Sequence, residues 1–206
     1  MLELFISAFV TLFVVIDPPG CAPIYAGLTT HASPELRRSM AIRACVIAAL
    51  ILVFFLLVGQ DLLAALHIEL DAFRIAGGIM LFLIALDMVF EKRTQRREER
   101  AEKVRDNPDI EDVSVFPMAM PMLAGPGAIA SVMLLQSKAN NLGGTLVVFA
   151  ALAAVLLLTL LALLAATPLM RLFGARVEAV LTRLLGVLLA ALAAQYVIDG
   201  LRGSFA

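Results

Sequence analysis

The longest apolar stretch of this chain is the feature that most limits its fold. From Ala139 to Met170 the sequence runs for 32 residues without a charged side chain. A helix needs about 20 apolar residues to cross the hydrocarbon core of a bilayer, so this stretch can span one. Hydrophobic residues make up 62% of the chain, whereas soluble domains are usually about 45–50% apolar. A chain of 206 residues cannot bury this excess in its own core, so we expect it to face lipid.

Further apolar stretches bring the expected number of membrane-spanning helices to six. The spans are expected at about residues 4–30, 40–60, 72–90, 115–136, 143–168 and 179–201. The N-terminal stretch lacks the basic region and the cleavage site of a signal peptide, so we interpret it as a retained first span. The sequence therefore predicts an all-α membrane protein with a single membrane domain over residues 1–206.

Basic residues are concentrated in three of the predicted loops. Three arginines lie in 31–43, seven lysines and arginines in 92–105, and three arginines in 171–183. In a six-span chain these loops share one side of the membrane, and an excess of Lys and Arg marks the cytoplasmic side. We therefore predict a multi-pass protein of the inner (plasma) membrane, with both termini outside the cytoplasm.

The linker at residues 91–112 carries charges of both signs. It holds seven basic and eight acidic residues. This mixture favours a solvated cytoplasmic connector over a segment that binds a partner protein or anionic lipid. Basic residues elsewhere are too few to indicate nucleic-acid binding.

Short motifs recur between the two halves at nearly the same offset. The pairs are Pro19-Gly20 with Pro126-Gly127, and Arg74-x-x-Gly77 with Arg183-x-x-Gly186. This spacing predicts two three-helix repeats, residues 1–90 and 113–206, joined by the linker. Because three is an odd number, the second repeat would be inverted in the membrane, an arrangement typical of secondary transporters.

Proline and glycine clusters should interrupt the first and fourth spans. The first cluster covers Asp17–Pro23, and the second comprises Pro117, Pro121 and Gly125-Pro126-Gly127. Proline removes a backbone donor and clashes with the preceding turn, so we expect the helix to unwind or bend at both places. Irregular backbone at membrane depth is tolerated only inside the protein or beside a water-filled cavity. The two breaks are therefore expected to meet near the midplane.

A solute-binding site is predicted at these breaks. Its candidate residues are Asp17, Pro18, Gly20, Pro121, Gly125, Pro126 and Gly127. The N-terminus of the half-helix after each break offers N–H groups and partial positive charge to a carboxylate. Asp17 would bind an ammonium group, a proton or a cation. The alternatives are a purely capping role for Asp17, ahead of a proline at the first helical position, and close helix packing for the Gly and Pro residues.

With these residues identified, the chain resembles the MarC family of bacterial and archaeal membrane proteins. The resemblance rests on residues 13–20, 73–79, 117–129 and 183–200, and it covers essentially the whole chain. It implies the same membrane fold. A few members of that family are linked to the transport of small neutral amino acids, so the resemblance also implies that class of substrate.

The leading hypothesis is a secondary transporter of small solutes, with amino acids as the expected substrate and proton or cation coupling through Asp17. The alternatives are a non-transporting membrane scaffold or stress-related factor and, less favoured, an intramembrane enzyme that uses Asp17 and Asp87. The sequence holds neither the Gly-x-Gly-Asp motif of intramembrane aspartyl proteases nor a Walker-type loop. We predict no catalytic residue, metal site or cofactor, and no particular oligomer.

Overall fold

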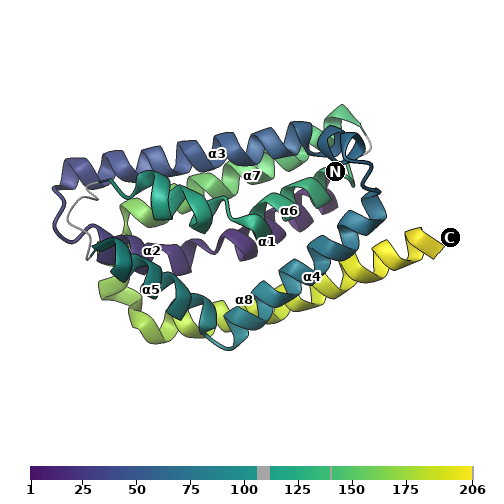
Figure 1. Ribbon diagram of the computed structural model, residues 1–206. Coiled ribbons are helices and arrows are strands. Elements are labelled where there is room, and N and C mark those ends of the chain that lie inside the picture. Colours follow the sequence, from purple (N-terminus) through teal and green to yellow (C-terminus); the bar gives the residue numbers. More distant parts are fainter. Residues whose placement is uncertain (106–111, 140, 206) are drawn as a thin grey trace.

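The computed structural model describes residues 1–105, 112–139 and 141–205, and every regular element in that part of the chain is helical (Figure 1). The elements are α1 (Leu2–Ile16), α2 (Pro18–Leu28), α3 (Pro34–Ala65), α4 (Leu70–Val89), α5 (Lys92–Arg105), the irregular segment η1 (Ser114–Leu123), α6 (Pro126–Gln136), α7 (Leu142–Leu164) and α8 (Ala166–Phe205). Within the described residues, five spans are long and apolar enough to cross a membrane, and the bent pair of η1 and α6 makes a sixth. The predicted all-helical membrane protein is confirmed.

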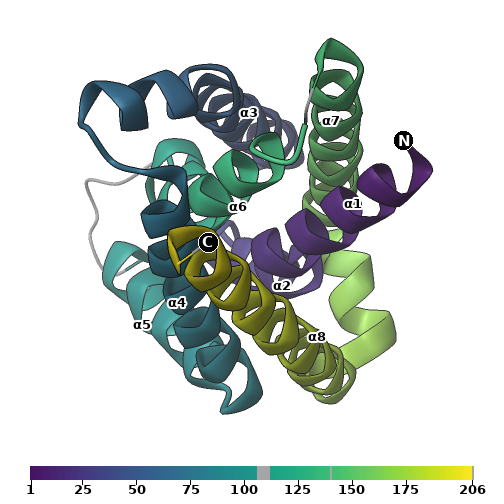
Figure 2. The same ribbon diagram turned by 90° about the vertical axis from the view of Figure 1, so that its right-hand side faces the viewer.

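The spanning helices run roughly along one direction (Figure 1). Both termini lie at one end of the bundle, whereas the α2–α3 turn, α5 and the α7–α8 junction lie at the other. The three basic segments that the sequence predicted as loops therefore lie at the same end, although 92–105 forms α5, 171–183 belongs to α8 and most of 31–43 belongs to α3. Viewed from the end that holds the termini, α3 and α7 lie on one side, and α4 and α8 pair on the other (Figure 2).

Large apolar side chains cover the outward faces of the bundle. Leu50 of α3 is 67% exposed and Leu146 of α7 is 60% exposed, although both lie within long apolar helices. Soluble monomers rarely expose apolar surface of this extent. These faces are the ones that contact lipid in a bilayer.

The closest helix pair is formed by α4 and α8, and glycines make its contact possible. A Cβ atom on Gly78 would lie 2.8 Å from the Ala193 carbonyl oxygen, and one on Gly186 would lie 2.9 Å from the Met88 Cβ. Small residues allow two helix backbones to approach in this way. We refer to these two helices as the α4–α8 pair.

The first span is interrupted at a single residue. Asp17 adopts left-handed backbone angles, φ 59° and ψ 65°, and helix resumes at Pro18. Prolines at the first helical positions are favourable, because their fixed φ suits a helix and no N–H is needed there. Pro23 lies inside α2. The interruption expected near Asp17–Pro23 is therefore found at Asp17, and the helix continues through Pro23.

The fourth span bends by 51° between η1 and α6. Phe116 and Met120 have extended backbone, with φ and ψ of −127° and 127°, and −129° and 127°. Each precedes a proline, whose ring disfavours helical angles in the residue before it. The predicted interruption of the fourth span is confirmed, and its cause is local.

We predict that Gly78→Ala destabilises the protein by about 1–3 kcal/mol, because the added methyl group meets backbone atoms of α8 that cannot rotate away. Gly27→Ala is the matched control, since nothing lies within 4 Å of a Cβ on this helical glycine. The chain has no tryptophan, so thermal unfolding in detergent is followed by far-ultraviolet circular dichroism. Equal melting temperatures for the two variants would contradict this account of the α4–α8 contact.

Candidate functional site

Asp17 joins α1 to α2, and its carboxylate caps the second helix. Its Oδ1 accepts a hydrogen bond from the Gly20 N–H at 3.1 Å. Pro18 and Pro19 have no N–H, so the Gly20 amide is the first donor that α2 offers. A Cβ on Gly20 would lie 2.3 Å from Asp17 Oδ2. Glycine at position 20 thus leaves the space that the carboxylate fills, and Asp17 caps α2, as the capping alternative for this residue expected.

An arginine from the charged linker reaches the same carboxylate. Arg97, on α5, places Nη1 3.1 Å from Asp17 Oδ2 and Nη2 3.4 Å from the Ile16 carbonyl oxygen. The side chains of Arg97 and Asp17 are 7% and 2% exposed. The expectation of a solvated connector is therefore wrong at Arg97, because the helix that carries it packs against α2 and α4.

Two more arginines of α5 hold this helix in place. Arg93 donates one hydrogen bond to the Val15 carbonyl oxygen and places its other terminal nitrogen 2.9 Å from Met88 Sδ. Arg96 forms an ion pair with Asp87 on α4. Desolvation, followed by repulsion from Arg97, lowers the pKa of Arg93 to about 10, so this guanidinium stays charged at neutral pH. We call these three residues the arginine face of α5.

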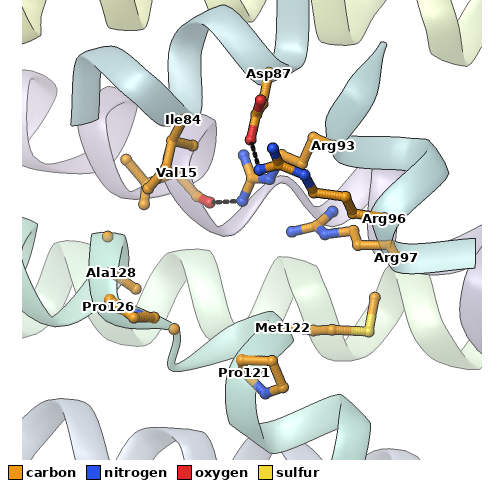
Figure 3. A pocket seen from close by; sticks show the side chains of 12 residues that line it. Val15, Ile84, Asp87, Arg93, Arg96, Arg97, Pro121, Met122, Pro126 and Ala128 are labelled. Carbon is orange, nitrogen blue, oxygen red and sulfur yellow. Dashed lines mark hydrogen bonds and ion pairs between the residues drawn. The ribbon is translucent and has the colours of Figure 1, made fainter. Parts of the chain in front are cut away.

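A cavity of about 160 Å³ lies between the arginine face and the break in the fourth span. All three arginines line it, together with Asp87 and Ile84 of α4 and Val15 of α1. The opposite wall consists of Pro121, Met122 and the turn that opens α6, Gly125-Pro126-Gly127-Ala128. Figure 3 shows the guanidinium groups on one side of this space and the proline-rich wall on the other.

The N-terminus of α6 contributes backbone polarity to the cavity. Its N-cap residue is Gly125, which has no side chain to accept from the first N–H groups. Such groups carry partial positive charge. A Cβ on Gly125 would lie 2.3 Å from the Pro121 carbonyl oxygen, and one on Gly127 would lie 2.4 Å from Ile84 Cδ1. Gly127 therefore brings the helix end close to α4 and α1, and Gly125 permits the turn against Pro121.

The structure places the predicted site residues in two groups. Pro121, Gly125, Pro126 and Gly127 line the cavity, whereas Asp17, Pro18 and Gly20 are buried beside it. Arg97 lines the cavity and contacts Asp17, so it connects the groups. The two interrupted spans also approach each other directly, because a Cβ on Gly127 would lie 3.4 Å from Val15 Cγ1. Sequence reasoning found both breaks and missed the arginine face.

The helices and the buried charges together define a multi-pass membrane protein with a polar cavity beside two interrupted spans. The chain belongs to the MarC family of integral membrane proteins, whose family model matches residues 2–205. It is therefore a multi-pass protein of the inner (plasma) membrane.

Relatives from distant organisms align with almost the whole chain. A UPF0056 membrane protein of Archaeoglobus fulgidus is 36% identical over 200 residues, covering 97% of this chain and 93% of the relative. A second, from Methanocaldococcus jannaschii, is 36% identical over 204 residues and covers 98% of both chains. The inner membrane protein YhgN of Escherichia coli K12 is 35% identical over 200 residues, covering 96% and 95%. No solved structure matches the chain significantly.

We predict that Arg97→Gln destabilises the protein by about 3–5 kcal/mol, because it leaves the buried Asp17 carboxylate without this counter-charge. Adding Asp17→Asn should recover much of the loss, since the double variant buries two neutral amides and the asparagine still caps α2. Arg96→Gln is the control. In its ion pair with Asp87, the Arg96 side chain is 61% exposed, so we expect the stability to change by no more than about 1 kcal/mol. Unfolding in detergent is measured for these three variants and for Asp17→Asn alone. Additive losses from the single substitutions at Arg97 and Asp17 would contradict a coupled pair.

Proposed function

We propose that this protein is a secondary transporter of small neutral amino acids. The observation that carries the proposal is the cavity between the broken fourth span and the arginine face, which presents both signs of charge to a small volume. Guanidinium groups and a helix N-terminus would attract a carboxylate, and a carboxylate at the cavity, Asp87 in its lining or Asp17 behind Arg97, would attract an ammonium group. A zwitterion carries both groups on adjacent atoms.

The size of the cavity favours the smallest amino acids. At about 160 Å³ it is close to the engineered cavity of about 150 Å³ that admits a benzene molecule. Alanine has as many non-hydrogen atoms as benzene, and serine has one more. A large aromatic amino acid would need the walls to move apart.

Two inverted repeats would supply the movement that transport requires. Each proposed repeat begins with an interrupted span, α1–α2 in residues 1–90 and η1–α6 in 113–206. Both repeats contribute to the cavity, Val15 and Ile84 from the first, Pro121 and Gly127 from the second. Rocking of one repeat against the other would open the cavity to each side in turn. Proton or cation coupling through Asp17 remains part of this proposal.

The proposed orientation places the linker helix in the cytoplasm and both termini outside. This orientation is supported by the position of the three basic segments, which lie together at one end of the bundle. We expect alkaline phosphatase fused after Ala206 to be active, and green fluorescent protein fused after Arg105 of a truncated chain to fluoresce. A fluorescent fusion at Ala206 would contradict the orientation.

Counterflow tests transport itself. Purified protein in proteoliposomes loaded with unlabelled glycine, alanine or serine should accumulate the labelled amino acid. Gly127→Val should lower that flux by about tenfold or more, the effect of about 1.4 kcal/mol on binding, because its side chain enters the cavity wall next to Ile84. Gly27→Val, on an open face of α2, is the matched control. A wild-type protein that moves none of the three amino acids would favour a non-transporting membrane factor.

A further inference from the structure

Arg97 stands between the cavity and the Asp17 carboxylate. The guanidinium lines the cavity, whereas Asp17 does not, and the two side chains meet at 3.1 Å on the far side of that wall. A solute that enters the cavity therefore meets Arg97 and not Asp17. The guanidinium occupies the position beside Asp17 that a solute's ammonium group would need.

We infer that Arg97 and Asp17 together form a recognition element for zwitterions, in which Arg97 receives the solute carboxylate and releases Asp17 to the solute ammonium. This inference rests on the proposed transport function and adds a specificity-determining residue, Arg97, from the linker. No covalent bond is made or broken in the exchange. The ion pair between Arg97 and Asp17 is replaced by two ion pairs with the solute. The exchange begins when the solute carboxylate binds Arg97 from the cavity.

The other possible carboxylate sites are less suited to this role. The N-terminus of α2 is already occupied by Asp17 itself, through the Gly20 N–H. Arg93 is held by the Val15 carbonyl oxygen and Met88, and Arg96 pairs with Asp87 at the more exposed edge. Of the arginine face, Arg97 is the member that links the cavity to a carboxylate buried at 2% exposure.

Charge balance makes the exchange selective. A zwitterion brings one positive and one negative group, so Arg97 and Asp17 each keep an opposite partner throughout. A simple carboxylate would take Arg97 and leave Asp17 without its counter-charge, and a simple amine would do the reverse. Removing one partner of a buried pair is strongly unfavourable, whereas a fully paired network is tolerated. The pair therefore rejects singly charged analogues of the same size.

The test is the order in which competitors displace labelled alanine from full-length protein in detergent. The competitors are unlabelled alanine, propionate, which lacks the ammonium group, and ethylamine, which lacks the carboxylate. Of the three competitors, only unlabelled alanine should displace the label from wild-type protein. Asp17→Asn should become sensitive to propionate, and Arg97→Gln should become sensitive to ethylamine. Each single variant should bind alanine about ten- to a hundredfold more weakly, the cost of one hydrogen bond to a charged group.

Two further variants separate recognition from folding. Arg97→Lys keeps the positive charge and should retain the wild-type order of competitors. The double variant Asp17→Asn with Arg97→Gln keeps the helix cap and should bind none of the three compounds with the wild-type affinity. Arg183→Gln, whose exposed ion pair with Glu91 does not belong to the cavity lining, should leave both the order and the affinity for alanine unchanged.

The outcomes distinguish this inference from the proposed function. If wild-type protein binds alanine but both single variants keep its affinity and competitor order, the inference is overturned and transport stands. If wild-type protein binds no glycine, alanine or serine, the proposed function fails and the inference fails with it. A reversed preference, with propionate competing in Arg97→Gln, would also overturn the assignment of the two charges.

Discussion

The ion pair between Asp17 and Arg97 is the interaction on which the rest of this structure depends. Each charge is almost fully buried, and burial of either one alone would be strongly unfavourable. Asp17 also ends α1 and begins α2, so the pair ties the break in the first span to the helix that follows the third span. That tie brings the arginine face of α5 against α1 and α4. One wall of the cavity is consequently built by a segment outside the membrane-spanning helices.

The second wall depends on residues that lack side chains or amide protons. Pro121 lies inside η1 and gives it no amide donor, and Gly125 permits a turn in which a Cβ would strike the Pro121 carbonyl oxygen. Gly127 then lets the start of α6 approach Ile84 and Val15. A polar helix end is thereby exposed to a cavity inside a protein whose outer surface is apolar. Irregular backbone in this position is stable only because protein surrounds it.

The sequence predicted the helices well, since long apolar runs and their charged boundaries are local signals. It also located both breaks, because proline and glycine act on their own backbone and on the residue before them. In the first break only Asp17 leaves the helix, since Pro18 and Pro19 sit where a helix start tolerates proline.

The arginine face was missed because it depends on tertiary contacts. Mixed charge in residues 91–112 resembles a solvated linker, and composition does not reveal that one face turns inward. A signal was present in the spacing: Arg93, Arg96 and Arg97 stand three and four residues apart, which places them on one side of a helix. A lone buried aspartate in the first span indicated a need for a counter-charge. Together these two observations would have suggested the pair.

Hydrogen–deuterium exchange of the wild-type protein, followed by mass spectrometry of peptides within residues 92–105, tests the docking of α5 most directly. Exchange measures how often each backbone hydrogen bond opens. If α5 is held by Arg97 on Asp17, these amides exchange slowly in the wild-type protein and markedly faster in Arg97→Gln. Rapid exchange in the wild-type protein, equal to that of the variant, would show a freely solvated linker and contradict the account.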